Sequence, residues 1–335
     1  MTDHIVPLER FRDARRVLDG RIHRTPILSS STAARVLAAG GVNVADGRIY
    51  AKAEHLQKTG AFKIRGALNK MGSLSAAERA AGVITLSAGN HAQGVALAAH
   101  EAGVHAVVMM PAGAVRSKVD ACVGYGADVI LYGRNVGETW ARMDEVQAER
   151  GLTFVPPFDD PWILAGQGTI GLEILEDCPA ATDVFVPVGG GGLIAGIGAA
   201  IKIRRSDVRI VGVEPAASAF MKASLRAGKI VSINEGPTAA DAVAGGIEPG
   251  SVTLGLCREY VDEMKTVGED RLKQALFLYG RWHHRLVEGA GGLALAACLK
   301  QKRKDRNRTI VLIASGGNID PLRWSRLTGL RPGKR

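Results

Sequence analysis

Short apolar runs alternate with amphipathic segments through most of the chain from residue 82 onward. Apolar runs of strand length lie at 83–86, 104–109 and 128–132, and helical patterns lie at 92–102, 116–124 and 138–150. Strands that alternate with helices are typical of a parallel sheet with helices on its faces. The pattern therefore predicts a small α/β unit in this part of the chain.

A second series of alternating segments follows, with an apolar run at 183–188, a helical pattern at 194–204 and an apolar run at 209–214. Further strands are predicted at 261–267 and 309–313, and further helices at 269–279 and 289–299. The fold class is therefore α/β, with two parallel-sheet units.

The first eighty residues combine helical patterns with one short strand. Leu8, Phe11 and Leu18 recur near one face of an amphipathic helix. Pro26 ends the helical pattern, and the sequence Ser30-Ser31-Thr32 offers a cap for a helix through Leu37. A short strand at 49–54 and a helix at 62–71 are predicted next.

Composition and charge exclude several classes of protein. The chain has 335 residues, 46% hydrophobic and 23% charged, which is typical of a soluble globular protein of about two domains. The formal net charge is +10, but the densest basic run, Lys300 to Arg308, contains no aromatic residue and reads as a solvated loop. We therefore expect no binding to nucleic acid.

The remaining composition favours a cytoplasmic protein with reduced thiols. The four cysteines are isolated, without metal-finger spacing. No apolar stretch reaches the roughly 18 residues that span a membrane, and the N-terminus lacks a signal-peptide pattern. We expect neither a membrane partner nor a metal site.

Lys63 stands among small and apolar residues, in the stretch Lys58-Thr59-Gly60-Ala61-Phe62-Lys63-Ile64-Arg65-Gly66. A lysine that forms a Schiff base needs a neutral amine, and apolar surroundings favour the neutral form. Taken alone, the stretch is more typical of a helix start whose lysine reaches water through its flexible stem. The other loops of the chain decide between these two interpretations.

Four consecutive glycines separate a predicted strand from a predicted helix: Gly189, Gly190, Gly191 and Gly192. Their backbone N–H groups can converge, and the start of the helix adds a partial positive charge, so the loop favours an anion. No acidic residue lies among them, which suits a phosphate. A tight turn made only for packing would need one or two glycines.

The same segment also resembles a dinucleotide-binding unit, because the next predicted strand ends in Glu214, near the place of a ribose partner. The glycine spacing fits that fingerprint only loosely. A nucleotide-binding regulatory protein or an oxidoreductase stays open as the alternative from another class.

Two further loops follow predicted strands. The first, Ser87-Ala88-Gly89-Asn90-His91, can hold an anion such as a substrate carboxylate, or Ser87 can simply cap the next helix. In the second, Ser315 offers a neutral hydroxyl. Ligands of parallel α/β folds collect at the carboxyl ends of strands. A phosphorylated aldehyde cofactor bound by a lysine needs such a set of groups.

The motifs resemble those of the fold-type II pyridoxal-phosphate enzymes, in particular the threonine/serine dehydratase and serine racemase group. The resemblance covers nearly the whole chain in the family's order. It rests on Thr25-Pro26, the stretch from Thr59 to Ala67, the stretch from Ser87 to Gly94, Pro187 to Leu193, Val213-Glu214-Pro215, and Ser315-Gly316-Gly317-Asn318.

The resemblance implies a fold and a cofactor. The fold would be of the tryptophan synthase β-like kind, with a large cofactor-binding domain from residues 1–77 and 153–335 and a small inserted domain from residues 78–152. The cofactor would be pyridoxal 5'-phosphate, and the protein would be a homodimer or a homotetramer.

The resemblance also implies roles for individual residues. Lys63 would form the Schiff base and act as the catalytic base, and Phe62 would lie against the cofactor ring. Asn90 would bond the 3′ oxygen and Ser315 the pyridine nitrogen. The remaining residues would bind the phosphate, namely Gly189, Gly190, Gly191, Gly192 and Leu193, or the substrate carboxylate, namely Ser87, Ala88, Gly89 and His91.

Three positions depart from the family's pattern. Ala88 occupies the position where racemases of the group carry a second serine, which favours elimination over racemisation. No acidic residue follows closely after Glu214-Pro215, so the divalent-metal site of some relatives looks incomplete. Ala242 replaces a glycine in the stretch Thr238 to Ala242, which bears on the shape of the substrate pocket.

We therefore expect a pyridoxal-phosphate lyase that converts a β-hydroxy amino acid, L-threonine or L-serine, to a 2-keto acid and ammonia. The alternatives within enzymes are a dehydratase of a bulkier substrate, such as a hydroxyaspartate or phenylserine, and an amino-acid racemase.

Overall fold

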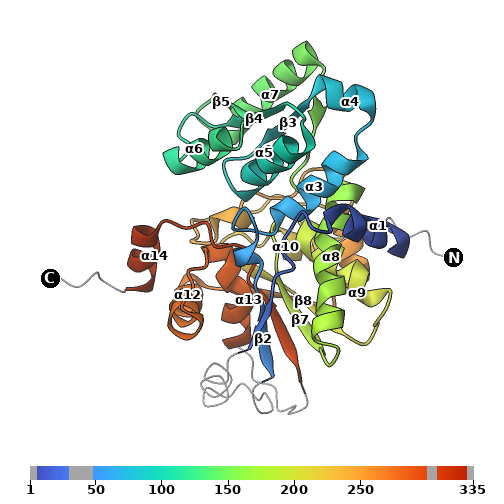
Figure 1. Cartoon of the computed structure of the whole chain (residues 1–335). Helices are drawn as coiled ribbons and strands as arrows, with labels where there is room; N and C mark the ends of the chain where they lie inside the picture. Colours follow the sequence, from blue (N-terminus) through green and yellow to red (C-terminus); the bar gives the residue numbers. More distant parts are fainter. Residues whose placement is uncertain (1–5, 30–47, 300–307, 330–335) are drawn as a thin grey trace. The chain divides into compact units, whose positions relative to one another are not determined.

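The computed structural model describes residues 6–29, 48–299 and 308–329 (Figure 1). The chain divides into two compact units, which we call the first unit (residues 1–23 and 62–169) and the second unit (residues 24–61 and 170–335). This division places residues 1–23, 62–77 and 153–169 with the inserted sheet, whereas the sequence prediction placed them in the larger domain. The predicted domain boundaries stay a prediction.

The first unit is built on a four-stranded parallel sheet in the order β5-β4-β3-β6. Its strands are β3 (Val83–Leu86), β4 (Ala106–Met110), β5 (Asp128–Leu131) and β6 (Thr153–Phe154). Its helices are α1 (Leu8–Leu18), α3 (Lys63–Ser73), α4 (Ala76–Ala81), α5 (Asn90–Ala102), α6 (Arg116–Gly124) and α7 (Val136–Arg150). The predicted alternation of strands and helices over 83–150 is confirmed.

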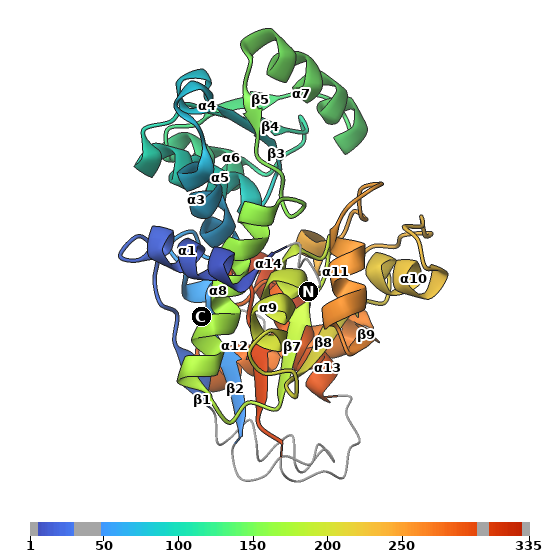
Figure 2. The ribbon, with the colours of Figure 1, turned by 90° about the vertical axis from the view of Figure 1, so that its right-hand side faces the viewer.

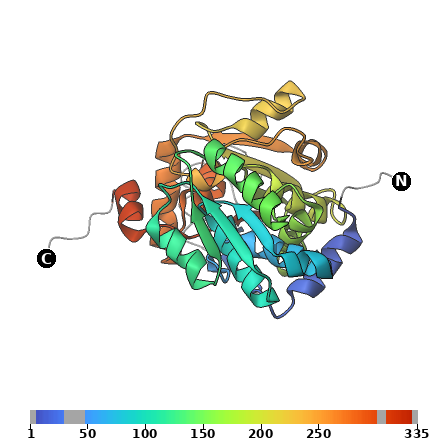
Figure 3. The same ribbon diagram turned by 90° about the horizontal axis from the view of Figure 1, so that it is seen from above.

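The helices of the first unit cover both faces of its sheet (Figures 2 and 3). Val83 and Val108 pack with residues of α5 and α6, whereas Ile84 and Val107 pack with Met143 of α7 and its neighbours. Successive side chains of a strand point to opposite faces, so strands that are buried on both faces read as continuous apolar runs.

The second unit has a six-stranded sheet in the order β1-β2-β10-β7-β8-β9, in which only the β1–β2 pairing is antiparallel. The strands are β1 (Ile27–Ser29), β2 (Ile49–Lys52), β7 (Asp183–Pro187), β8 (Arg209–Pro215), β9 (Glu263–Val267) and β10 (Ile310–Ile313). The helices are α9 (Gly192–Lys202), α10 (Phe220–Ala227), α11 (Thr253–Tyr260), α12 (Glu269–His283), α13 (Gly289–Leu299) and α14 (Pro321–Thr328). Two short 3-10 helices, η1 (Glu54–Leu56) and η2 (Asp241–Val243), complete the unit.

Helices α12 and α13 lie on one face of this sheet and α9 on the other (Figures 1 and 2). Phe185 and Val211 face the α12–α13 side, where they join the core around Leu276 and Leu293. The predicted parallel sheet of the second unit is thus confirmed, with β1 and β2 added at one edge.

Several helices were not predicted from the sequence, and α8 (Pro161–Asp177) is the longest of them. Residues 163–174 of α8 are buried on every side, so the helix shows no contrast between an apolar and a polar face. The division between the two units falls within α8, after Thr169. The predicted helix from Ser30 to Leu37 and most of the basic run from Lys300 lie outside the described residues.

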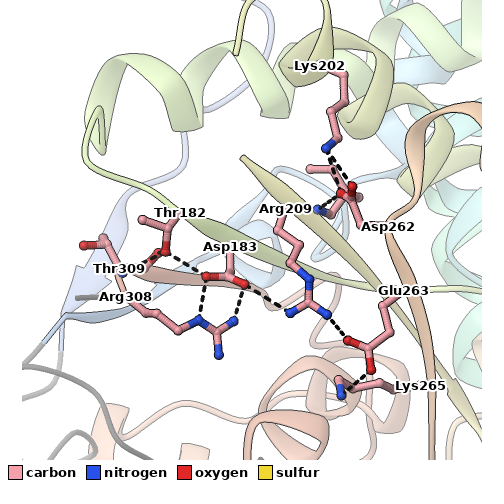
Figure 4. A network of polar contacts seen from close by, with 10 residues as sticks. Thr182, Asp183, Lys202, Arg209, Asp262, Glu263, Lys265, Arg308 and Thr309 are labelled. Carbon is pink, nitrogen blue, oxygen red and sulfur yellow. Dashed lines mark hydrogen bonds and ion pairs between the residues drawn. The ribbon is translucent and has the colours of Figure 1, made fainter. Parts of the chain in front are cut away.

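A network of charged side chains joins the amino ends of β7, β8 and β9 with Arg308, two residues before β10 (Figure 4). Asp183 accepts hydrogen bonds from the guanidinium of Arg308, including one of 2.8 Å from Nε, and both side chains are buried. Arg209 lies 3.6 Å from Asp183 and also pairs with Glu263, which accepts a hydrogen bond of 2.6 Å from Lys265. This edge of the sheet is therefore held by paired charges.

Among the described residues, no helix is both long enough and apolar enough to cross a membrane.

Candidate active site

Lys63 is the first residue of α3, and its amine faces protein rather than bulk water. Nζ donates a hydrogen bond of 2.5 Å to the carbonyl oxygen of Pro157 and lies 5.3 Å from the centre of the Phe62 ring. Burial lowers the pKa of Lys63 to about 8. A much larger fraction of this amine is therefore neutral near pH 7 than of an ordinary lysine. This is the property that the sequence suggested for a lysine that attacks a carbonyl.

The loop from Ser87 to Asn90 lies beside Lys63 because α5 packs closely against α3. A Cβ at Gly94 would lie only 3.2 Å from the backbone carbonyl carbon of Lys63, so a larger residue would press on this part of the backbone. The Ser87 hydroxyl accepts a hydrogen bond of 3.1 Å from the N–H of Gly89, which shapes the turn into α5. Ala88 is half-buried in this turn, and Asn90, the first residue of α5, is buried.

His91 is buried beneath the same loop. Its Nε2 lies 3.0 Å from the carbonyl oxygen of Val155, and its Nδ1 has no hydrogen-bond partner among the described residues. Burial and the nearby charge of Lys63 lower the pKa of His91 to about 3. The ring is therefore neutral at ordinary pH.

The glycine loop of the second unit joins β7 to α9. Gly191 caps α9 with a left-handed φ of +91°. A Cβ on it would lie 2.7 Å from Met221 Cε and 3.0 Å from Thr253 Cβ, while a Cβ on Gly189 would lie 2.9 Å from the carbonyl oxygen of Val243. Side chains in this loop would thus collide with their surroundings, and only glycine leaves the backbone free to approach a ligand.

Thr253, the first residue of α11, fixes this loop from outside. Its hydroxyl donates a hydrogen bond of 2.7 Å to the carbonyl oxygen of Gly190. Leu193, the second residue of α9, is buried below the loop. The loop is therefore held by contacts on several sides before any ligand binds.

Ser315 follows β10, directly beside the glycine loop in sheet order, because β10 and β7 are parallel neighbours. Ser315 is buried, and its loop is tied to the residues that precede Lys63 in the chain. Gly316 pairs with Ala61 in an antiparallel bridge, and Asn318 Nδ2 donates a hydrogen bond of 2.7 Å to the carbonyl oxygen of Thr59. These contacts join the Ser315 loop to the start of the Lys63 stretch.

Glu214 at the end of β8 is committed to protein contacts. Its two carboxylate oxygens accept hydrogen bonds of 2.7 and 2.9 Å from the N–H groups of Met221 and Lys222 at the start of α10. Burial raises its pKa to about 7, against the effect of these hydrogen bonds. A ribose partner in a dinucleotide site needs a carboxylate that faces the ligand, so this geometry does not favour the dinucleotide interpretation.

The structure thus gathers the predicted residues in two groups. Lys63, Phe62 and the Ser87–His91 loop lie together in the first unit, and the glycine loop and Ser315 lie together in the second unit. Three contributors were missed by the sequence analysis: the Pro157 carbonyl, the Thr253 hydroxyl and the Asn318 amide. A backbone carbonyl leaves no signal in a sequence, although the Pro156-Pro157 pair marks a stiff segment.

Both groups fit a phosphorylated aldehyde cofactor. The lowered pKa of Lys63 favours the neutral amine that reacts with an aldehyde. In the glycine loop a Cβ would collide with its neighbours, so the backbone N–H groups stay open to a ligand. The donor set contains a lysine, backbone N–H groups, an amide and a hydroxyl, which suit an aldehyde, a phosphate and a heteroaromatic ring. Among the described residues, no three metal-binding side chains cluster.

The sequence profile of the family described as "Pyridoxal-phosphate dependent enzyme" matches residues 18–316. An L-threonine ammonia-lyase of Thermotoga maritima is 43% identical over 316 residues, which cover 94% of this chain and 76% of that protein. The catabolic L-threonine dehydratase of Escherichia coli K12 is 42% identical over 326 residues, covering 97% of this chain and 96% of the relative. The solved structure of maize serine racemase matches with a TM-score of 0.89 and 31% identity, covering 97% of this chain and 98% of that one.

Proposed function

The chain belongs to the pyridoxal-phosphate-dependent enzymes, and from this premise we propose that it dehydrates and deaminates a β-hydroxy amino acid, L-threonine or L-serine. The products are a 2-keto acid and ammonia. The observation that carries the proposal is the place of the Lys63 amine at the start of α3, 2.5 Å from the carbonyl oxygen of Pro157, at the position where the family's motif places its lysine. Burial lowers the pKa of this amine to about 8. Identity of 42–43% with proteins named for the reaction of L-threonine supports the choice of substrate.

We assign the binding of the cofactor to residues at strand ends and helix starts. Lys63 would hold its aldehyde carbon, and Phe62 would lie against its ring. Asn90 would donate to its 3′ oxygen, and Ser315 would bond its pyridine nitrogen. The N–H groups of the loop from Gly189 to Gly192, with that of Leu193, would bind its phosphate.

When bound, pyridoxal phosphate supplies a sink for the negative charge left at the substrate's α-carbon. With the cofactor bound, Lys63 would do the proton chemistry: its neutral Nζ would accept the α-proton of the substrate. Desolvation of Nζ favours this neutral form. The protonated Nζ would then return the proton to the β-hydroxyl, which would leave as water, and hydrolysis of the resulting enamine would give the 2-keto acid and ammonia.

Elimination is favoured over racemisation by the residue after Ser87. A racemase needs a proton donor on each side of the α-carbon, whereas Ala88 has no proton to give. The Ser87 hydroxyl accepts a hydrogen bond from the N–H of Gly89, which shapes the turn. The likeness to maize serine racemase keeps racemisation as the second candidate.

A bulkier β-hydroxy amino acid is the other candidate, and Ala242 is the reason. Ala242 is an exposed residue of η2, next to Val243, whose carbonyl faces Gly189. A methyl group at this position changes the surface beside the glycine loop. The substrate side chain therefore has to be mapped with a series of amino acids.

The proposal is tested by the release of ammonia and 2-keto acid from L-threonine and L-serine by the protein loaded with pyridoxal phosphate. Equimolar release of both products is expected. Lys63→Ala should abolish release and also the visible absorbance of the covalently bound cofactor, whereas Lys229→Ala, at an exposed lysine of the second unit, serves as the matched control. Normal turnover by Lys63→Ala would refute the assignment of Lys63, and formation of the D-amino acid alone would favour the racemase.

A further inference from the structure

The segment from Val155 to Asp160, which connects β6 to α8, lies along one face of α3. Lys63 and Lys70 stand two turns apart on this helix and therefore share a face. Lys63 Nζ donates to the Pro157 carbonyl at 2.5 Å, and Lys70 Nζ pairs with Asp160 Oδ2 at 2.7 Å. The first unit thus holds the Lys63 amine against a backbone carbonyl of this connection.

The other end of the connection is fixed by two buried side chains. The carbonyl oxygen of Val155 accepts a hydrogen bond of 2.9 Å from the hydroxyl of Thr85 and lies 3.0 Å from His91 Nε2. The N–H of Val155 donates a hydrogen bond of 2.9 Å to the carbonyl oxygen of Ile84. Thr85 is 0% exposed and His91 is 3% exposed, so water does not compete for these bonds.

Pro156 and Pro157 follow Val155, whose carbonyl is held, and the carbonyl of Pro157 is the one that accepts from Lys63. Pro156 and Pro157 each have φ locked near −65° by the ring, and Pro156 restricts the residue before it as well. Because the segment is stiff, holding Val155 in place also restricts the position of Pro157, two residues later. The position of the Pro157 carbonyl therefore depends on how firmly Val155 is held.

The hydrogen bond to Val155 also fixes the tautomer of His91. A carbonyl oxygen can only accept, so Nε2 carries the ring proton and Nδ1 carries a lone pair. A lone pair cannot hold a substrate carboxylate, which needs a donor. In this arrangement the His91 ring bonds the backbone of the protein, and the contact of His91 with the substrate carboxylate stays a prediction.

We propose that Thr85 and His91 are positioning residues for Lys63: by holding the carbonyl of Val155 they place the carbonyl of Pro157 as the acceptor that aims the Lys63 amine. The inference rests on the proposed role of Lys63 as the residue that binds the cofactor. It adds an anchored backbone acceptor to that role. Whenever Lys63 is not bound to the cofactor, its amine is kept in one orientation.

The test measures how fast the cofactor-free protein captures added pyridoxal phosphate, followed by the absorbance of the covalently bound cofactor. Thr85→Val removes the hydroxyl at nearly constant volume. We expect capture to slow by about 2- to 10-fold, the effect of one lost hydrogen bond on the orientation of the amine. Thr85→Ser restores the donor and should restore the rate.

Thr139→Val is the matched control, since Thr139 is also a 0% exposed threonine of the first unit. Its hydroxyl bonds the carbonyls of Tyr132 and Asn135, each at 2.8 Å, on the far side of the sheet in α7. This variant loses a similar buried bond and should capture the cofactor at the wild-type rate. A second variant, His91→Gln, retains an N–H donor and should slow capture less than His91→Leu.

Equal capture rates in wild type, Thr85→Val and His91→Leu would overturn the inference. An equal slowing in Thr85→Val and Thr139→Val would also overturn it, because the effect would then be general loosening. Capture does not require turnover, so a wild-type protein that captures the cofactor but releases no ammonia would refute the dehydratase and leave this inference standing. Failure of the wild type to capture pyridoxal phosphate would refute both.

Discussion

Replacing Gly191 by alanine should destabilise the protein by about 3 kcal/mol in the absence of cofactor. An L-residue in the left-handed region costs about 1–2 kcal/mol, and Gly191 has φ +91°. The new Cβ would also lie 3.0 Å from Thr253 Cβ, which cannot swing away as the end of Met221 can. Overpacking of this kind costs about 1–3 kcal/mol. Alanine also lowers the conformational entropy of the unfolded chain, which offsets about 0.4–1 kcal/mol of this loss in stability.

A matched glycine separates the two contributions. Gly245 also has a positive φ, +109°, but a Cβ on it would meet nothing within 4 Å. Gly245→Ala should therefore cost about 1 kcal/mol, from the backbone conformation alone. Urea denaturation of the two cofactor-free variants and the wild type gives the comparison. The expected difference of about 2 kcal/mol between the variants measures the close approach at Gly191.

The same variants test the role of the loop as a phosphate cradle. A shifted loop loses aligned N–H groups, so Gly191→Ala should weaken the binding of pyridoxal phosphate by about tenfold or more. The affinity of pyridoxal, which lacks the phosphate, should change little. The reasoning would be refuted if Gly191→Ala were no less stable than Gly245→Ala, or if the affinities for pyridoxal and pyridoxal phosphate fell equally.

Three further outcomes are expected. Asp183→Asn should lower the free energy of unfolding by about 3–5 kcal/mol, because Arg308 would remain buried without its anion. The control, Asp207→Asn, removes one carboxylate of an exposed pair and should leave the free energy of unfolding unchanged within experimental error. Equal losses for the two variants in urea titrations would contradict this prediction. Thr253→Val should weaken the binding of pyridoxal phosphate about fivefold through the freed glycine loop, and equilibrium titration should show Thr253→Ser near wild type. The rate of cofactor capture should rise with pH and level off above about 8, as the Lys63 amine loses its proton; a flat profile from pH 6 to 9 would argue against a neutral amine as the reacting form.

The sequence predicted most of the parallel framework because strands such as β3, β4, β7 and β10 are short apolar runs that are followed by loops. It missed α8, whose glycines and apolar residues are buried all around, and the short strands β1 and β6, of three and two residues. Neither case leaves a periodic pattern. Helix starts were predicted a few residues late where the first turn lies in a glycine-rich loop, as at Asn90 and Gly192.

For the candidate site, the side chains that follow strands could be predicted from the sequence, but the contacts that hold them could not. The glycine loop was predicted from four consecutive glycines. Its hydrogen bond with the Thr253 hydroxyl joins residues more than sixty positions apart and could not be predicted. The Pro157 carbonyl was invisible because any residue has a carbonyl. The role expected for His91 depended on which ring nitrogen is free, and only the structure shows Nε2 facing Val155.

The charged network of Figure 4 and the glycine and serine loops lie at opposite ends of the same strands. Five residues of strand separate them by about 16 Å. Mutations that reshape the loops therefore need not disturb the ion pairs that hold the sheet. As the family diverges, the loops at the carboxyl ends of the strands can therefore change, and with them the substrate preference. No stabilising mutation has to come first to compensate.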